Sequence, residues 1–196
     1  MTPRPRRIGL FGGTFDPPHN AHVALASLAL SELALDELRW IPTGQPWQKS
    51  RQITPAAQRE AMVRLAMEGE PRFMIERCEI KRQGPSFTLD TVRELRATKP
   101  GAEWFLIIGQ DQYANLHTWR DWRELLALVT LAVANRPGVA AQPHPDVQAA
   151  AQHVVPLPML DIASTDIRER VAAGQDISAL VPAGVARYIE ANHLYR

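Results

Sequence analysis

The fold of this chain is decided near its start, by the stretch Ile8-Gly9-Leu10-Phe11-Gly12-Gly13-Thr14-Phe15-Asp16-Pro17-Pro18-His19-Asn20-Ala21-His22. Residues 8–11 are apolar and predict a short buried strand, which Gly12 and Gly13 break before an Ala- and Leu-rich run that predicts a helix. Because glycine has no Cβ, its backbone N–H groups can approach a ligand closely, and a helix start adds unpaired N–H groups and partial positive charge. This arrangement predicts an anion site, most often a phosphate site.

His19 and His22 make the prediction more specific. They lie three residues apart at the start of the predicted helix, so their imidazoles share one face, where both can donate hydrogen bonds to phosphate oxygens. Taken singly, each could instead be a helix cap or half of a metal site. A zinc site needs more ligands at suitable spacing, and the single cysteine, Cys78, offers no thiolate cluster. We therefore interpret the pair as phosphate ligands and assign no metal ligand to the protein.

Size and composition indicate one cytoplasmic domain. A chain of 196 residues suffices for a single α/β domain over 1–196, in which we expect a C-terminal helical subregion from about residue 164. The formal net charge of +1 predicts no nucleic-acid partner, because no large basic surface is available. One cysteine allows no intrachain disulfide, and no run of about twenty apolar residues predicts a membrane span. The sequence leaves open whether the protein forms a homo-oligomer.

Apolar segments alternate with helical segments along the rest of the chain. Strands are predicted over 38–42, 73–78, 103–108, 131–134 and 154–157, and helices over 23–35, 56–67, 89–97, 169–173 and 185–193. This alternation predicts parallel βαβ units, and hence an α/β protein with a doubly wound parallel sheet whose ligands bind at the carboxyl ends of the strands. The motifs G-x-x-x-x-G-K-[ST] and G-x-G-x-x-G are absent, so a different loop must hold phosphate.

Three basic or polar residues after the second strand have open interpretations. Lys49, in the loop 43–53, either reaches a phosphate or is a solvated charge. Gln58 and Arg59 fall in the first turns of the helix 56–67, and we expect them on its exposed face.

The strand 103–108 ends in a second candidate site. Gly109 and Asp111 follow it, and an aspartate at this edge either accepts from a ribose hydroxyl or caps a helix. Trp119 and Trp122 come next. Burying two indoles with both N–H groups satisfied is difficult, so we expect one of them to face a ligand ring.

Two later helix starts carry hydroxyl residues. Ser86 or Thr88 can cap the helix 89–97, and Ser164 and Thr165 give the same signal further on. Arg168, one turn later, lies on the same face as that cap. On spacing alone Arg168 is more often a surface residue than a ligand residue.

Four stretches together resemble the nucleotidyltransferases with an H-x-G-H signature, in particular the bacterial nicotinate mononucleotide adenylyltransferases. They are residues 12–22, Gly84-Pro85-Ser86-Phe87-Thr88, Gly109-Gln110-Asp111 followed by Trp119, and Ile162-Ala163-Ser164-Thr165-Asp166-Ile167-Arg168. The resemblance covers nearly the whole chain and implies a Rossmann-like nucleotidyltransferase fold with a C-terminal helical segment. Three residues depart from the family pattern: Ala21 replaces a glycine, while Phe87 and Ala163 each lose a hydroxyl.

The resemblance also implies a role for each matching residue. It implies that ATP is bound by Gly12, Gly13, Thr14, Phe15, His19, His22, Gly109, Asp111, Ser164, Thr165 and Arg168, with catalytic roles for His22, His19 and Arg168. It implies that the pyridine nucleotide is bound by Thr88, Trp119, Lys49 and Thr43. In this scheme His22 contacts the α-phosphate, Arg168 the β- and γ-phosphates, and Asp111 the adenosine ribose.

The implied reaction is adenylyl transfer from ATP to nicotinate mononucleotide, which gives deamido-NAD and pyrophosphate. No protein nucleophile is required, because the attacking phosphate is already anionic, so catalysis consists of positioning and charge neutralisation. Mg²⁺ would be held mainly by the ATP phosphates and water. Two alternatives stay open: transfer to another phosphate acceptor, such as nicotinamide mononucleotide or phosphopantetheine, and a nucleotide-sensing module without turnover.

Overall fold

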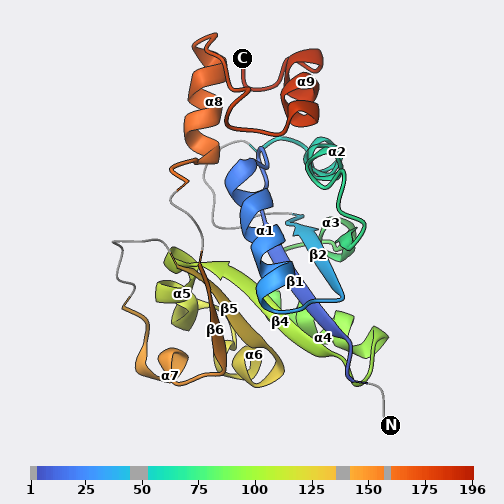
Figure 1. Cartoon of the computed structure of the whole chain (residues 1–196), viewed down its shortest axis with the longest axis vertical. Coiled ribbons are helices and arrows are strands. Elements are labelled where there is room, and N and C mark those ends of the chain that lie inside the picture. Colours follow the sequence, from blue (N-terminus) through green and yellow to red (C-terminus); the bar gives the residue numbers. More distant parts are fainter. Residues whose placement is uncertain (1–3, 45–52, 136–141, 157–159) are drawn as a thin grey trace.

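A parallel β-sheet forms the centre of the molecule (Figure 1). The computed structural model describes residues 4–44, 53–135, 142–156 and 160–196. Within them the sheet has six strands: β1 (Arg7–Gly13), β2 (Glu37–Pro42), β3 (Phe73–Ile75), β4 (Glu103–Gly109), β5 (Thr130–Asn135) and β6 (Gln152–Pro156). Their spatial order is β3-β2-β1-β4-β5-β6, with every neighbouring pair parallel. The direction of winding reverses between β1 and β4, and doubly wound sheets bind ligands at this switch point.

Helices cover both faces of the sheet. In the described ranges they are α1 (Asn20–Glu32), α2 (Ala56–Ala66), α3 (Cys78–Lys81), α4 (Thr88–Thr98), α5 (Gln110–Asn115), the 3₁₀ helix η1 (Leu116–Thr118), α6 (Trp122–Leu128), α7 (Pro145–Gln148), α8 (Ser164–Ala172) and α9 (Ala183–Ala191). One face packs against α4, α5 and α6, and the other against α1 and α2. This architecture confirms the predicted α/β class and the doubly wound parallel sheet.

Strand β4 contributes side chains to two apolar clusters, one on each face of the sheet. Trp104, Leu106 and Ile108 belong to the cluster under α4, α5 and α6. Phe105 and Ile107 belong to the cluster under α1. Because successive side chains of a strand point to opposite faces, a strand covered on both sides requires an uninterrupted apolar run. This apolar segment lies in the middle of the sheet, between β1 and β5.

Helices α8 and α9 pack beside the sheet instead of on it. Ile167, Val185 and Ile189 join residues of α2 in a third apolar cluster. Figure 1 shows α8 and α9 together at the top of the view, near the end of α1 that follows the first loop. The backbone N–H of Asn20 donates to the carbonyl oxygen of Leu180 at 2.9 Å. The connection between α8 and α9 therefore contacts the start of α1 directly.

The first strand is longer than predicted. Gly12 and Gly13 do not break it, because β2 pairs with both, opposite Ile41 and Pro42. The next backbone N–H, from Thr43, donates to the Gly13 oxygen at 3.0 Å. Pairing with β2 continues the strand through both glycines even though they have low strand propensity, while pairing with β4 ends at Leu10.

Other boundaries differ by a few residues. Helix α1 begins at Asn20 where the prediction began at 23, and α8 begins at Ser164 where it began at 169. The N–H groups of a first helical turn have no helical partner and accept polar neighbours, so an apolar pattern places helix starts too late. Strand β3 ends at Ile75 and α3 occupies the end of the predicted strand 73–78. Strand β6 begins two residues before the predicted 154–157, whose last residue lies outside the described ranges.

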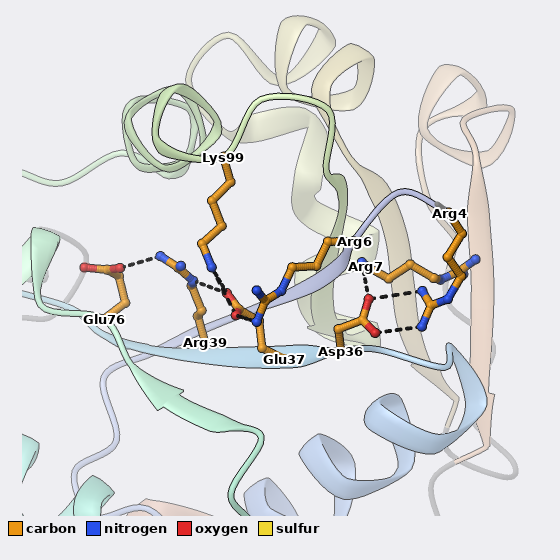
Figure 2. A network of polar contacts seen from close by, with 8 residues as sticks. All are labelled: Arg4, Arg6, Arg7, Asp36, Glu37, Arg39, Glu76 and Lys99. Carbon is orange, nitrogen blue, oxygen red and sulfur yellow. Dashed lines mark hydrogen bonds and ion pairs between the residues drawn. The ribbon is translucent and has the colours of Figure 1, made fainter. Parts of the chain in front are cut away.

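The amino-terminal edge of the sheet carries an ion-pair network (Figure 2). Glu37, buried at the start of β2, accepts hydrogen bonds from three basic side chains. These are Arg6, Arg39 and Lys99, at donor–acceptor distances between 2.7 and 3.1 Å. Burial alone would raise the pKa of Glu37, but the hydrogen bonds from Arg39 and Lys99 outweigh it and leave the pKa below its usual value. Ion pairs therefore stabilise the amino-terminal edge of the sheet. The carboxyl-terminal edge is where a doubly wound sheet binds ligands.

Candidate active site

A cavity of about 530 Å³ lies at the carboxyl-terminal edge of the sheet, at the switch point between β1 and β4. Its walls come from the ends of these two strands, the loop after β1, the start of α1 and the connections that precede α4 and α8. Pockets of this size ordinarily hold small molecules.

The cavity brings most of the predicted site residues together. The lining includes Gly12, Gly13, Thr14, Phe15, His19, His22, Thr43, Thr88, Gly109, Trp119 and Ser164. Asp111, Thr165 and Arg168 lie nearby in sequence but are not part of the lining. Lys49 lies outside the described residues.

His19 and His22 form a stacked pair in the cavity. Their ring centroids are 3.7 Å apart and the ring planes differ by 24°. His19 is the N-cap residue of α1, and its backbone N–H donates to Nδ1 of His22 at 3.2 Å. Because Nδ1 of His22 accepts this hydrogen bond, a neutral His22 ring carries its proton on Nε2. The backbone thereby makes Nε2 of His22 a hydrogen-bond donor.

Two phenylalanine rings, Phe11 and Phe15, pack against the ring of His22. The buried ring of Phe15 meets it edge-on, with centroids 5.2 Å apart, and Phe11 lies 5.5 Å from Phe15. Phe15 has φ of 49°, in the left-handed region that non-glycine residues rarely adopt. Burial of its ring offsets this backbone strain. The packing holds the loop in one conformation beside the histidines.

The two glycines of the loop serve different purposes. A Cβ on Gly12 would meet no atom within 4 Å, whereas a Cβ on Gly13 would lie 2.8 Å from the ring of Phe15. Gly13 is therefore required for packing of the loop, and Gly12 is the position that leaves space beside the cavity.

Arg59 is a buried residue that donates hydrogen bonds to the loop after β1. The expectation that it lies on an exposed helix face is wrong. The side chain is only 1% exposed. Its Nη1 donates to the oxygen of Thr14 at 2.8 Å. Its other nitrogens donate to the oxygens of Thr43, Gly44 and Thr54 at 2.7 to 3.2 Å. A guanidinium has enough donors to satisfy four converging carbonyls, so its burial does not leave the charge without hydrogen bonds.

The sequence held a signal for this burial. Arg59 occupies the same helical stripe as Met62, Val63 and Ala66, all of which are buried. Spacings of three, four and seven residues place these side chains on one face of α2. An arginine within an apolar stripe of a helix therefore indicated a buried guanidinium.

The segment 162–168 joins the loop from the other side. The hydroxyl of Ser164 donates to the oxygen of Pro17 at 2.9 Å, and Nη1 of Arg168 donates to the oxygen of Asp16 at 2.8 Å. Nη2 of Arg168 also donates to Oγ1 of Thr165 at 3.0 Å. Arg168 therefore packs against the loop after β1. Spacing alone had favoured a solvated surface residue, and the structure does not show one.

Tyr195, next to the end of the chain, also contacts the loop. Its hydroxyl donates to Oδ1 of Asp16 at 2.7 Å. Burial raises the pKa of Tyr195 above its usual value, and the negative charge of Asp16 adds to the effect. The two residues are 179 positions apart in the sequence, and no local pattern indicated the contact.

The far end of the cavity contains Trp119 and Thr88. Of the two neighbouring tryptophans, Trp122 is buried in the core, whereas Trp119 is partly buried and lines the cavity. Ser86 also lines this end, and its buried Oγ has no hydrogen-bond partner among the described residues. Helix α4 begins at Thr88 without a side-chain cap. The capping role expected for Ser86 or Thr88 is therefore wrong, and their hydroxyls lie at the cavity.

Glu79 is a buried carboxyl group in the cavity wall that sequence reasoning did not identify. Its Oε1 accepts a hydrogen bond from Oγ1 of Thr91 at 2.9 Å. Burial raises the pKa of Glu79, although the hydrogen bond from Thr91 and the charge of Arg82 oppose the effect.

Comparison with known proteins places the chain in a family. A family model described as cytidylyltransferase-like matches residues 10–170. A probable nicotinate-nucleotide adenylyltransferase from Methylibium petroleiphilum is 50% identical over 196 residues, which cover 97% of this chain and 92% of that protein. This chain belongs to the nicotinate-nucleotide adenylyltransferase family. A second member, from Bordetella pertussis, is 43% identical over 196 residues, or 97% of this chain and 98% of that protein.

Solved structures show the same fold. The Plasmodium falciparum nicotinic acid mononucleotide adenylyltransferase complexed with NaAD matches with a TM-score of 0.81 at 16% identity, over 97% of each chain. The complex of the same protein with APC matches with a TM-score of 0.80 at 15% identity, again over 97% of each chain. The adenylyltransferase fold predicted from the resemblance is thereby confirmed.

The residues in which this chain departs from the family's pattern fit the structure. Ala21 is buried in the first turn of α1, where a good helix former is accommodated. Phe87 and Ala163 precede α4 and α8 in extended conformations, and neither helix has a side-chain cap. The ring of Phe87, which lacks the tyrosine hydroxyl, lies against the guanidinium of Arg120.

Two features are absent from the described ranges of the chain, a cluster of metal-ligating side chains and a membrane-spanning helix. No group of three or more His, Cys, Asp or Glu side chains there could hold a metal ion. No helix there is both long and apolar enough to cross a bilayer.

Proposed function

We propose that this protein transfers the adenylyl group of ATP to nicotinate mononucleotide, giving deamido-NAD and pyrophosphate. The observation that carries the proposal is the stacked pair His19 and His22, which lines a cavity at the switch point of the sheet and the start of α1. The names of relatives that are 43–50% identical over nearly the whole chain support the same reaction.

The reaction is an in-line displacement at phosphorus. An oxygen of the 5′-phosphate of nicotinate mononucleotide forms a bond to the α-phosphorus of ATP. The bond from that phosphorus to the bridging oxygen of the β-phosphate breaks, and pyrophosphate leaves with the electron pair. The nucleophile is an anion of the substrate, so the protein has to align the two phosphates and neutralise the charge that develops between them.

His22 is the residue we assign to the α-phosphate. Its Nδ1 is engaged by the backbone N–H of His19, so Nε2 is the atom that can donate to a non-bridging oxygen. This hydrogen bond strengthens as charge builds on that oxygen in the transition state. Further donors on the phosphate chain would be His19 and the backbone of Gly12.

Arg168 is assigned to the β- and γ-phosphates. Its contact with the oxygen of Asp16 supports this role, because it keeps the guanidinium beside the loop that we propose to hold ATP. Ser164 and Thr165 at the start of α8 would assist it, since a helix start favours anions. Asp111, in the first turn of α5, would accept from the adenosine ribose, next to Gly109.

The pyridine nucleotide would occupy the far end of the cavity. Trp119 would stack on the pyridine ring, and the hydroxyl of Thr88 would donate to its substituent. Thr43, at the end of β2, would contact the nucleotide from the opposite wall. Lys49 completes the set predicted from the sequence.

Mg²⁺ would reach this site on ATP. The donor set in the described ranges fits this arrangement, because it contains no cluster of three metal-ligating side chains. The ion would supply charge neutralisation on the phosphates and keep water among its ligands. The cytoplasm is the proposed location, since ATP is the substrate and the single cysteine indicates no disulfide chemistry.

A pyrophosphate-release assay with purified protein, ATP and Mg²⁺ tests the proposal. Nicotinate mononucleotide, nicotinamide mononucleotide and phosphopantetheine are offered in turn as acceptors. We expect the highest kcat/KM with nicotinate mononucleotide and deamido-NAD as the product. A preference for phosphopantetheine would refute the assigned acceptor, and no turnover with any acceptor would favour a nucleotide-sensing module.

A further inference from the structure

One end of the cavity holds a cation to which the mechanism above gives no role. Arg120 lies in the connection between η1 and α6 and lines the cavity. In the part of the chain that the structure describes, it is the only lysine or arginine in the lining. It directly follows Trp119, the residue that we propose to stack on the pyridine ring. Its position therefore places a positive charge at the pyridine end.

An aromatic platform orients Arg120. Its guanidinium carbon lies 4.7 Å from the centroid of the Phe87 ring, and Phe87 also lines the cavity. Stacking on a ring fixes the plane of a guanidinium and leaves its N–H edges for another partner. Within the described ranges Arg120 pairs with Asp121, whose Oδ2 lies 3.5 Å from Nε, but both side chains are 57% exposed. Such an exposed pair contributes little and does not use up the donors of Arg120.

The same cavity also contains an acidic side chain, Glu79. Glu79 is a buried carboxyl group in the lining, and when ionised it would repel a negatively charged ligand. A carboxylate that binds here therefore needs a compensating cation, whereas a neutral carboxamide does not. Arg120 supplies that cation.

We propose that Arg120 selects a pyridine nucleotide that carries a carboxylate over one that carries a carboxamide. The inference rests on the proposed function and specifies its substrate. A guanidinium donates charge-assisted hydrogen bonds to a carboxylate, often two in parallel. A carboxamide bears no charge and offers one oxygen as acceptor, so it gains much less from the same group.

The variant Arg120→Gln tests the inference, and Arg123→Gln is its control. Arg123 also stacks on an aromatic ring, with its guanidinium carbon 4.1 Å from the centroid of Trp122, and it pairs with Asp146. It does not line the cavity. Both arginines are exposed enough that their loss should leave the fold intact, which a thermal melt verifies.

The measurement is kcat/KM for nicotinate and for nicotinamide mononucleotide with each protein. Arg120→Gln should lower the value for nicotinate mononucleotide about tenfold, the scale of one partly exposed charge-assisted contact, and change the value for the amide less than about twofold. Arg120→Lys keeps the charge and should recover part of the preference. Arg123→Gln should match the wild type with both substrates.

Two results would overturn the assignment of Arg120. One is an acid-to-amide ratio that is unchanged in Arg120→Gln. The other is an equal fall with both substrates, which indicates a structural role. Failure of the proposed function gives a different result: the wild-type protein itself would then turn over neither pyridine nucleotide, and the inference would be refuted with it.

Discussion

Replacement of Tyr195 by phenylalanine tests whether the end of the chain stabilises the nucleotide loop. The substitution keeps the ring and removes one hydroxyl, which donates to Oδ1 of Asp16 at 2.7 Å. Asp16 is 1% exposed, so water cannot readily replace the lost donor. It also lines the cavity beside the histidines. The change therefore removes a hydrogen bond from the loop without leaving a cavity in the packing.

The expected loss follows from the type of contact. A hydrogen bond to a charged group contributes about 1.5–3 kcal/mol. Asp16 has other contacts, including that of Arg168 with its backbone oxygen, so we take the lower part of this range. The free energy of unfolding should fall by about 1.5–2 kcal/mol, which for a chain of this length lowers Tm by about 3–8 °C. The KM for ATP should rise, because the loop is held less firmly.

The assay is urea denaturation at several pH values, with Tyr188→Phe as the control. The hydroxyl of Tyr188 makes no hydrogen bond within the described ranges, so its loss should change stability by less than about 0.5 kcal/mol. Because the pKa of Tyr195 is raised in the folded state, its contribution is fully present below the unfolded value of about 10 and is lost as pH rises further. The difference between wild type and Tyr195→Phe should therefore be constant between about pH 6 and 9.

The reasoning fails if Tyr195→Phe is as stable as the Tyr188→Phe control. It also fails if stability falls but the KM for ATP is unchanged, because the contact would then have no influence on the loop.

Three further substitutions address the site. His22→Ala should lower kcat by about 10²–10³ with little loss of stability, as for removal of one transition-state donor, and near-normal turnover would exclude His22 from the mechanism. Trp119→Ala should raise the KM for the pyridine nucleotide and leave the KM for ATP unchanged; the opposite pattern would place the pyridine ring elsewhere. Glu79→Gln should become more stable relative to the wild type as pH rises above about 4.5, because burial raises the pKa of Glu79 and the protein loses stability as that group ionises. Equal pH dependence of the two proteins, measured by denaturation, would contradict this account.

The central parts of the fold could be predicted because they depend on local patterns. The apolar run from Trp104 to Ile108 predicts a strand buried on both faces, and its position in the sheet follows from the alternation of elements. The spacing of His19 and His22 predicted a shared face, and the rings stack at 3.7 Å. Local periodicity was sufficient for both.

The residues that the sequence did not reveal act over long distances. Arg59 is buried because carbonyls from three separate segments converge on it, and Tyr195 meets Asp16 from the opposite end of the chain. The apolar stripe of α2 indicates that Arg59 is buried, but no periodicity shows which carbonyls it binds or that Tyr195 meets Asp16. The break expected at Gly12 and Gly13 was wrong for a related reason, since the hydrogen bonds that continue the strand come from β2.

A crystal structure with a non-hydrolysable ATP analogue and Mg²⁺ tests the central claim most directly. The account predicts a non-bridging oxygen of the α-phosphate about 3 Å from Nε2 of His22, with the triphosphate along the backbone after β1. A triphosphate bound away from the two imidazoles, with the hydrogen bond between His19 and His22 Nδ1 replaced by another arrangement, would contradict it.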